Sequence, residues 1–310
     1  MEEKKSRHHY VWQFYLRAWT IDDRIWCQHD GKRFTNSTRN VAVERDFYRL
    51  RELSADDVAI IQGIINQATA ELRRLNQVWL DSFNALFAAK KINEAQGGNR
   101  PEVEQEIEVA LNNLDENLHA SIEGRTIPHL TALRKGDMSW MDRIEDFSSF
   151  AHFLCVQTFR GPGMRTRMQA AFEKLRGREM DSGVLCHVFA TNVGASLVAR
   201  RRSLRMTLLR APAAAEFITG DQPVINTRAL DRSGTVVPTE VEFFYPVSPR
   251  FALLISMDHA SPGRFRELLR ASDVTRYNAM IAVMAQQQLY ATSEEALKSA
   301  ASIVAPEQFK

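Results

Sequence analysis

Two adjacent histidines near the start of the chain are the first side chains that could carry chemistry. His8 and His9 lie in the segment Arg7–Trp19, together with Gln13 and five aromatic residues. Chain ends are normally frayed, so this composition predicts that the segment is folded into the body of the protein. A neutral histidine can bind a metal or act as a general base near pH 7. Because adjacent strand residues face opposite ways, at most one of the two is expected to enter a given site. The alternative is that they pack and hydrogen-bond to their neighbours.

Two carboxylates are candidates for a catalytic or metal-binding role. Asp221 follows a predicted strand, Phe217–Thr219, and precedes Pro223. A carboxylate at a strand end is a common metal ligand or general base, although the same pattern also fits a turn in which the side chain caps its own backbone. Glu123 is the second candidate, and the alternative for it is a plain surface glutamate. In the functional interpretation, both would bind a divalent metal such as Mg²⁺ or activate water.

A glutamine and an arginine form a candidate phosphate clamp. Gln157 and Arg160 are three residues apart, so they share one face of a predicted helix, just before Gly161-Pro162-Gly163. An arginine in this place suits the binding of a phosphate or a carboxylate. The alternative is a cation that is favoured by the dipole at the helix C-terminus.

Basic residues are concentrated in one part of the chain. Residues 157–210 contain eleven Lys or Arg and three acidic residues, whereas residues 81–150 contain seven and thirteen. Arg200, Arg202 and Arg205 belong to the densest run and are the candidate residues for holding a nucleic-acid strand through its phosphates. The alternative is a solvated rim that balances the acidic helices.

Composition excludes several classes of protein. The chain has 310 residues, 45% of them hydrophobic, and a net charge of only +2. Its three cysteines lack metal-ligand or redox spacing, which predicts a reduced, cytoplasmic protein. No apolar run is long enough to suggest contact with a membrane interior. The phosphate-binding loops, the Gly-x-Ser-x-Gly elbow and the His-Glu-x-x-His zinc motif are all absent from the sequence.

The hydrophobic pattern changes twice along the chain and predicts an α+β fold. Alternation over about 8–48 predicts strands, with a hairpin around Asp30-Gly31. Helical periodicity then predicts one long helix over 54–91 and a second from Pro101 to about 119, which together form a helical hairpin. Further predicted elements are helices at 142–159, 164–177, 182–198, 262–271 and 273–288, and strands at 204–208, 217–219, 241–245 and 251–255.

These elements predict one mainly helical domain over 1–310, from which the hairpin at 54–120 protrudes. An antiparallel sheet would draw on N-terminal strands (about 8–48) and C-terminal strands (about 203–256). The hairpin is a candidate surface for a homo-oligomer or a partner protein.

Segment Arg7–Trp19 resembles the opening of a widespread, mostly bacterial family of unknown function, whose members begin HHYVPQFYLRxF. The resemblance extends to residues 44–48 and to Glu123, Gln157 and Arg160. It continues with residues 217–223 and 245–250 and with Asn278. This sequence departs from the pattern at Trp12, Gly220 and Gln222. The resemblance implies a shared fold and a shared polar set, which consists of His8, His9, Gln13, Glu123, Gln157, Arg160 and Asp221.

Three functions are compatible with this set. In the first, the protein is a metal-dependent phosphodiester hydrolase, such as a nuclease with a toxin or phage-defence role. In the second, it is a non-enzymatic module that binds nucleic acid, a nucleotide or a protein. In the third, the polar residues form a buried network that fixes the fold.

Overall fold

The computed structural model describes residues 2–97, 100–177, 180–230, 240–257 and 261–301. The N-terminal aromatic segment packs against C-terminal strands, as its composition predicts. It forms strand β1 (Arg7–His9), helix α1 (Gln13–Leu16) and a 3₁₀ turn. The Tyr15 hydroxyl donates a hydrogen bond to the carbonyl of Pro246 (2.7 Å), and Trp19 Nε1 donates to the carbonyl of Phe217 (2.8 Å).

The predicted hairpin around Asp30-Gly31 is present. Strands β2 (Arg24–His29) and β3 (Lys32–Ser37) pair on either side of it. Asp30 and Gly31 have φ values of 49° and 72°, which suits a two-residue turn that needs positive φ at both positions. Strand β4 (Val43–Arg45) pairs with β1 instead of joining this hairpin.

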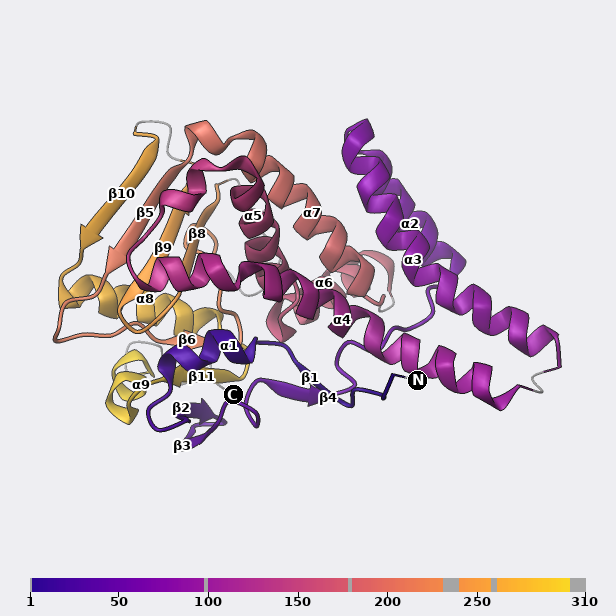
Figure 1. The fold of residues 1–310 in the computed structure, drawn as a ribbon, viewed down its shortest axis with the longest axis horizontal. Coiled ribbons are helices and arrows are strands. Elements are labelled where there is room, and N and C mark those ends of the chain that lie inside the picture. Colours follow the sequence, from indigo (N-terminus) through magenta and orange to yellow (C-terminus); the bar gives the residue numbers. More distant parts are fainter. Residues whose placement is uncertain (1, 98–99, 178–179, 231–239, 258–260, 302–310) are drawn as a thin grey trace.

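The prediction of one helix over 54–91 is wrong. The segment forms two helices, α2 (Ala55–Asn66) and α3 (Ala70–Ala95), because the Thr69 side chain caps the start of the second. Helix α4 (Pro101–Arg134) is also longer than predicted, and it runs from the hairpin tip to the sheets in Figure 1. The predicted break at 96–101 lies partly outside the described residues.

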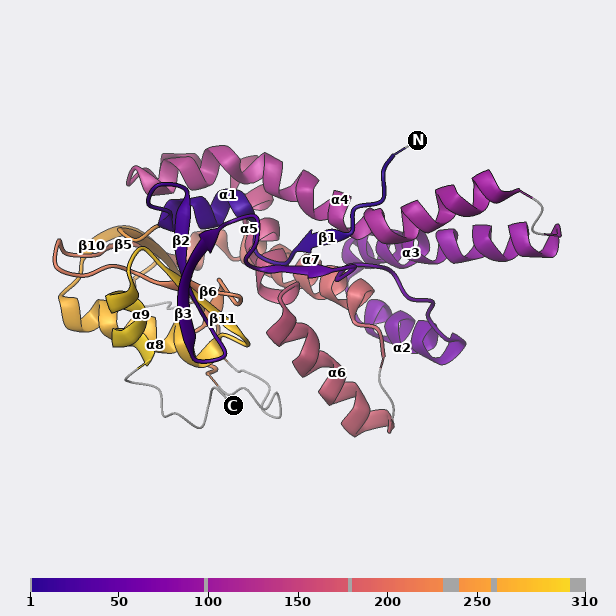
Figure 2. The same ribbon diagram turned by 90° about the horizontal axis from the view of Figure 1, so that it is seen from below.

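Three further helices connect the hairpin to the sheets. They are α5 (Ile144–Phe159), α6 (Pro162–Arg176) and α7 (Gly183–Ala199), close to the predicted bounds. Helices α5 and α7 pack tightly on each other, and α3 packs on α7. Figure 2 shows α6 projecting from this layer on the side opposite α4.

Within the part of the chain that the structure describes, the strands form three sheets. The four-stranded sheet, in the order β3-β2-β11-β6, mixes N-terminal and C-terminal strands as predicted. The five-stranded sheet, in the order β10-β5-β9-β8-β7, is built from C-terminal strands only, and β1 and β4 form a separate pair. The remaining bounds are β5 (Arg205–Arg210), β6 (Thr219–Gly220), β7 (Ile225–Asn226), β8 (Glu242–Pro246), β9 (Phe251–Ser256), β10 (Gly263–Leu268), α8 (Ala271–Met284), β11 (Gln288–Ala291) and α9 (Glu294–Ala301). The predicted α+β class is therefore confirmed.

Two predictions near the C-terminus are wrong. Residues 262–271 were expected to be helical, but 263–268 form β10, an edge strand parallel to β5. The spacing of Phe265, Leu268 and Leu269 imitates a helical stripe, yet pairing with β5 decides the structure. The helix predicted for 273–288 ends at Met284, and Gln288 begins β11. None of the helices in the described residues is long and apolar enough to cross a membrane.

Candidate functional site

Glu123 on α4 and Arg160 at the end of α5 form a buried ion pair. Arg160 Nη2 lies 2.7 Å from Glu123 Oε1, and only 2% of Arg160 is exposed. Arg160 also donates to the backbone carbonyls of Tyr10 (3.2 Å) and His9 (3.3 Å). Burial raises the pKa of Glu123 to about 7, against the opposing charge of Arg160 and a hydrogen bond with Gln157. The arginine therefore fastens the end of β1 to α4 and α5.

His8 and His9 face opposite sides of β1, as predicted. His8 is fully buried, and its Nδ1 accepts a hydrogen bond from the backbone N–H of Tyr48 (2.9 Å). Its ring also stacks on the Tyr48 ring. Burial lowers the pKa of His8, so this histidine is neutral near pH 7. His9 is half-buried, with Nδ1 3.5 Å from the Gln13 amide nitrogen.

Asp221 caps a backbone segment from another part of the chain. Its carboxylate accepts hydrogen bonds from the backbone N–H groups of Gln286 (2.7 Å), Gln287 (2.6 Å) and Gln288 (2.9 Å). The turn at Asp221 also packs against Gly161, where an added Cβ would lie 3.0 Å from the Asp221 carbonyl oxygen. The carboxylate thus fixes the entry to β11 beside the start of α6.

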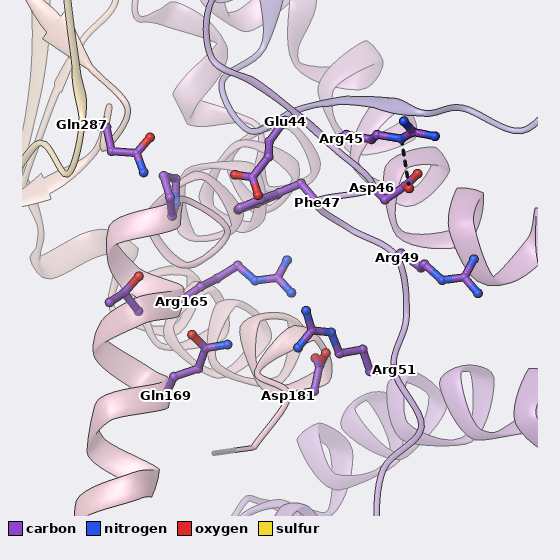
Figure 3. A pocket seen from close by; sticks show the side chains of 12 residues that line it. Glu44, Arg45, Asp46, Phe47, Arg49, Arg51, Arg165, Gln169, Asp181 and Gln287 are labelled. Carbon is purple, nitrogen blue, oxygen red and sulfur yellow. Dashed lines mark ion pairs between the residues drawn. The ribbon is translucent and has the colours of Figure 1, made fainter. Parts of the chain in front are cut away.

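A pocket of about 470 Å³ opens next to these buried groups (Figure 3). Its walls are formed by β4 and the segment that follows it, the first turns of α6, the residues just before α7 and the loop before β11. Its charged lining consists of four arginines, Arg45, Arg49, Arg51 and Arg165, and three carboxylates, Glu44, Asp46 and Asp181. We call the cavity that these seven charged residues line the arginine pocket. Gln287, which Asp221 positions, also lines it.

The guanidinium groups of the arginine pocket differ in how firmly they are held. Arg165 lies over the rings of Phe47 (4.9 Å) and Tyr48 (5.8 Å). Arg49 Nη2 is 2.5 Å from a Glu108 carboxylate, but its Nη1 is buried and has no hydrogen-bond partner among the described residues. Figure 3 shows Arg51 and Arg165 pointing into the same space. Arg165 is thus held in place by aromatic rings, whereas Arg49 is held by Glu108 and keeps one nitrogen without a partner in the described part of the chain.

A second group of ionisable side chains lies behind the pocket. Asp115 and His119 on α4 and His187 on α7 place three potential metal ligand atoms within 4.8 Å of one another. All three residues are buried, and burial lowers the pKa of His119 well below its ordinary value. The group could hold a metal ion. The predicted metal ligands Glu123 and Asp221 do not belong to it.

The basic run at 200–210 lies away from the arginine pocket. Arg200 follows the C-terminus of α7, whose other end adjoins the pocket, and a helix of 17 residues is about 25 Å long. Arg201 donates to backbone carbonyls of Met141 and Asp142, and Arg205 lies over the Phe265 ring (4.0 Å). Arg200, Arg202 and Arg205, which the sequence predicts to hold a nucleic-acid strand, therefore lie on a surface separate from the arginine pocket.

Comparison with known proteins places the chain in a family whose function is not established. A family described as protein of unknown function, DUF4238, matches residues 7–295. The chain belongs to the DUF4238 family. Neither a curated protein nor a solved structure matches it. The expected membership of a family of unknown function is thereby confirmed, and the activity must be argued from the site itself.

In this DUF4238 protein, Glu123, Gln157 and Arg160 of the predicted polar set interact directly, whereas His8 and Asp221 bind backbone groups elsewhere. His8, Glu123, Gln157, Arg160 and Asp221 are buried around the junction of β1, α4, α5 and α6, and we call these five residues the buried frame. His9 and Gln13 lie beside it. None of these residues lines the arginine pocket, which adjoins the frame.

Sequence reasoning treated Glu44 and Asp46 chiefly as turn or surface groups and only secondarily as ligands. It missed the pocket residues Arg49, Arg51, Arg165 and Asp181, and also the group of Asp115, His119 and His187. Asp115 and His119 are four residues apart on one predicted helix, and this spacing was a readable signal. His187 is 72 residues from Asp115, so their contact could not be read from the chain. Arg51 and Arg165 carried no signal, because a helical or loop arginine usually belongs to the surface.

Proposed function

We propose that this protein is a phosphodiester hydrolase whose substrate phosphate binds in the arginine pocket. The observation that carries the proposal is a cavity of about 470 Å³ that four arginines and three acidic residues line, with the side chains of Arg51 and Arg165 pointing into the same space (Figure 3). That volume lies within the usual range for small-molecule sites. Guanidinium groups bind phosphate through paired, charge-assisted hydrogen bonds.

The arginines would bind the phosphate and stabilise the charge that develops on it. Arg165 suits this role, because the Phe47 and Tyr48 rings hold its guanidinium group before a ligand arrives. A preorganised donor is worth more than one that must reorient during the reaction. Arg51 would supply a second guanidinium group, since its side chain points into the same space (Figure 3).

The carboxylates favour hydrolysis over simple binding. Negative side chains in a pocket repel a phosphate, so they weaken a site that only binds one. A hydrolase needs such groups, either to accept a proton from water or to hold a hard cation such as Mg²⁺. Glu44, Asp46 and Asp181 are therefore the candidates in place of Glu123 and Asp221. A nuclease of this kind would suit a toxin or phage-defence role.

The test is turnover of a generic phosphodiester, bis-p-nitrophenyl phosphate, and of labelled single-stranded DNA and RNA with Mg²⁺ or Mn²⁺. We expect Arg165→Met to lower kcat/KM by about 10²–10³ and Glu44→Gln to lower kcat more than it raises KM. The matched control is Arg176→Met, an exposed arginine at the far end of the same helix. Equal turnover in all three variants would contradict the proposal.

A second function, non-enzymatic binding of a nucleotide or nucleic acid, is favoured by one observation. Every buried group first expected to be catalytic has a structural partner: His8 with Tyr48, Glu123 with Arg160, and Asp221 with the 286–288 backbone. The same samples separate the two functions. Phosphodiester binding that Arg165→Met abolishes, without turnover in any metal, would favour the binding module.

A further inference from the structure

Asp115, His119 and His187 bring three potential metal ligands, one carboxylate and two imidazoles, together in the interior. His187 Nε2 lies 2.6 Å and His119 Nε2 lies 3.4 Å from the same Asp115 Oδ1. The exposed fractions of the three residues are only 1–3%. Two of the ligands are one turn apart on α4, and the third comes from α7, so the group joins two long helices.

Hydrogen bonding within the group leaves it incompletely satisfied. Both imidazole rings direct Nε2 at one carboxylate oxygen, while Nδ1 of each ring is buried without a hydrogen-bond partner among the residues described. The surroundings offer little compensation, since Trp79 stacks on His187 (4.6 Å) and Tyr48 packs on His119 (4.6 Å). Burying these Nδ1 atoms without partners is costly, but a metal bound at Nε2 would leave them as they are. The case for a metal therefore rests on the three ligand atoms that already face one another.

We propose that these three residues bind one divalent transition-metal ion of the zinc type. Bonds of about 2.0–2.1 Å in a tetrahedron place neighbouring ligand atoms about 3.3 Å apart. Asp115 Oδ1 and His119 Nε2 are 3.4 Å apart and already match this value, whereas Asp115 Oδ1 and His187 Nε2, at 2.6 Å, must move apart by less than about 1 Å. The three residues offer ligand atoms that all lie within 4.8 Å of one another, so the two imidazoles must also adjust their separation. Imidazole nitrogens select zinc-type ions, whereas Mg²⁺ prefers oxygen ligands and retains its waters.

The metal would fasten α4 to α7 and would lie next to the arginine pocket. Arg165 lines that pocket, and its charge also acts on the Asp115 carboxylate. This positive charge opposes a cation, so we expect neutralising it with Arg165→Met to tighten metal binding. None of the three ligands lines the pocket. The inference therefore goes beyond the proposed hydrolysis and can fail or succeed without it.

The experiment uses the full chain after dialysis against a chelator. Adding Co²⁺ is expected to give the visible absorption of a tetrahedral site at one ion per chain, which Zn²⁺ displaces and excess Mg²⁺ does not. Trp79 fluorescence should be quenched in parallel, because its ring stacks on a ligand. No visible band, or a band that Mg²⁺ abolishes, would overturn the proposal.

Variants locate the site. His119→Gln and His187→Gln should each lose the cobalt band. His129→Gln should retain it, since His129 is a buried histidine on the same helix that pairs with Asp146 (3.1 Å) outside the group. Bands of equal strength in all three variants would overturn the assignment. If a variant does not fold, the unaltered protein decides: Zn²⁺ must raise its Tm, and an unchanged Tm at saturating Zn²⁺ refutes the site.

Discussion

Arg160 and Arg165 lie five residues apart, one in the buried frame and one in the arginine pocket. Arg160 is 2% exposed and engages Glu123 and two backbone carbonyls. Arg165 rests on two aromatic rings and lines an open cavity. The first can only hold the structure together, whereas the second can also receive a ligand. The difference indicates that the buried frame supports a neighbouring site, which residues 44–47 of the family resemblance line together with residues from α6 and the loops.

The largest expected loss of stability follows from a substitution in the buried frame. Arg160→Met leaves the Glu123 carboxylate unpaired, and removing one partner of a buried ion pair costs about 3–5 kcal/mol. Urea denaturation at pH 7.5 should show this loss in the free energy of unfolding. The double variant Glu123→Leu/Arg160→Met should be less damaging than the two single losses together, because no unpaired charge remains. A loss below about 1 kcal/mol in Arg160→Met would contradict the structural role that distinguishes Arg160 from Arg165.

Asp221→Asn should have a smaller effect of the same kind. Hydrogen bonds to a charged group contribute about 1.5–3 kcal/mol, and the amide keeps only one acceptor oxygen for three backbone N–H groups. We expect a loss of about 2 kcal/mol by urea denaturation and faster hydrogen exchange at residues 286–288. If Asp221 instead supplied a catalytic carboxylate, activity would vanish while stability and exchange stayed unchanged.

Lowering the pH should decrease the free energy of unfolding through His152 on α5. Burial lowers the pKa of His152 from 6.5 to about 4, helped by the charges of His187 and Arg125. Below pH 6.5 the unfolded chain therefore binds a proton at His152 that the folded protein does not bind until the pH approaches 4. The contribution of His152 to the free energy of unfolding is fully present above pH 6.5 and is lost as the pH falls toward 4. The loss reaches at most about 1.4 kcal/mol per pH unit. Urea melts at pH 7.5 and 5.0 should show a smaller drop for His152→Gln than for the unaltered chain, and equal drops would contradict this account.

The smallest effect on stability is expected in the pocket. Arg51 is exposed, so Arg51→Ala should change the free energy of unfolding by no more than about 0.5 kcal/mol. Its affinity for a phosphodiester, measured by calorimetry with a phosphorothioate dinucleotide, should nevertheless fall at least tenfold. If Arg51→Ala unfolds more easily than the unaltered protein but binds the dinucleotide equally well, Arg51 has a structural role like that of the buried frame.

Much of the fold was readable from the sequence because local signals agreed with the tertiary structure. The Asp30-Gly31 hairpin and helices α5 to α7 are examples. The failures lie where non-local contacts decide. Pairing with β5 turns 263–268 into a strand, and contact with β2 creates β11 from residues that resembled a helix end.

The candidate site was predicted in part for a similar reason. Glu123, Gln157 and Arg160 meet as expected, since they belong to the set that the resemblance singled out. That they face inward, and that Arg165 faces the cavity, depends on how α5 and α6 meet at Gly161. A periodic pattern gives the buried face of each helix but not the geometry between helices, so the pocket could not be predicted.

A crystal structure with a non-hydrolysable phosphorothioate dinucleotide tests the central claim most directly. The account predicts the phosphorothioate group inside the arginine pocket, with its oxygen atoms in hydrogen-bond distance of Arg165 and Arg51. A ligand bound instead along Arg200–Arg210, with the pocket empty in the same crystal, would contradict it.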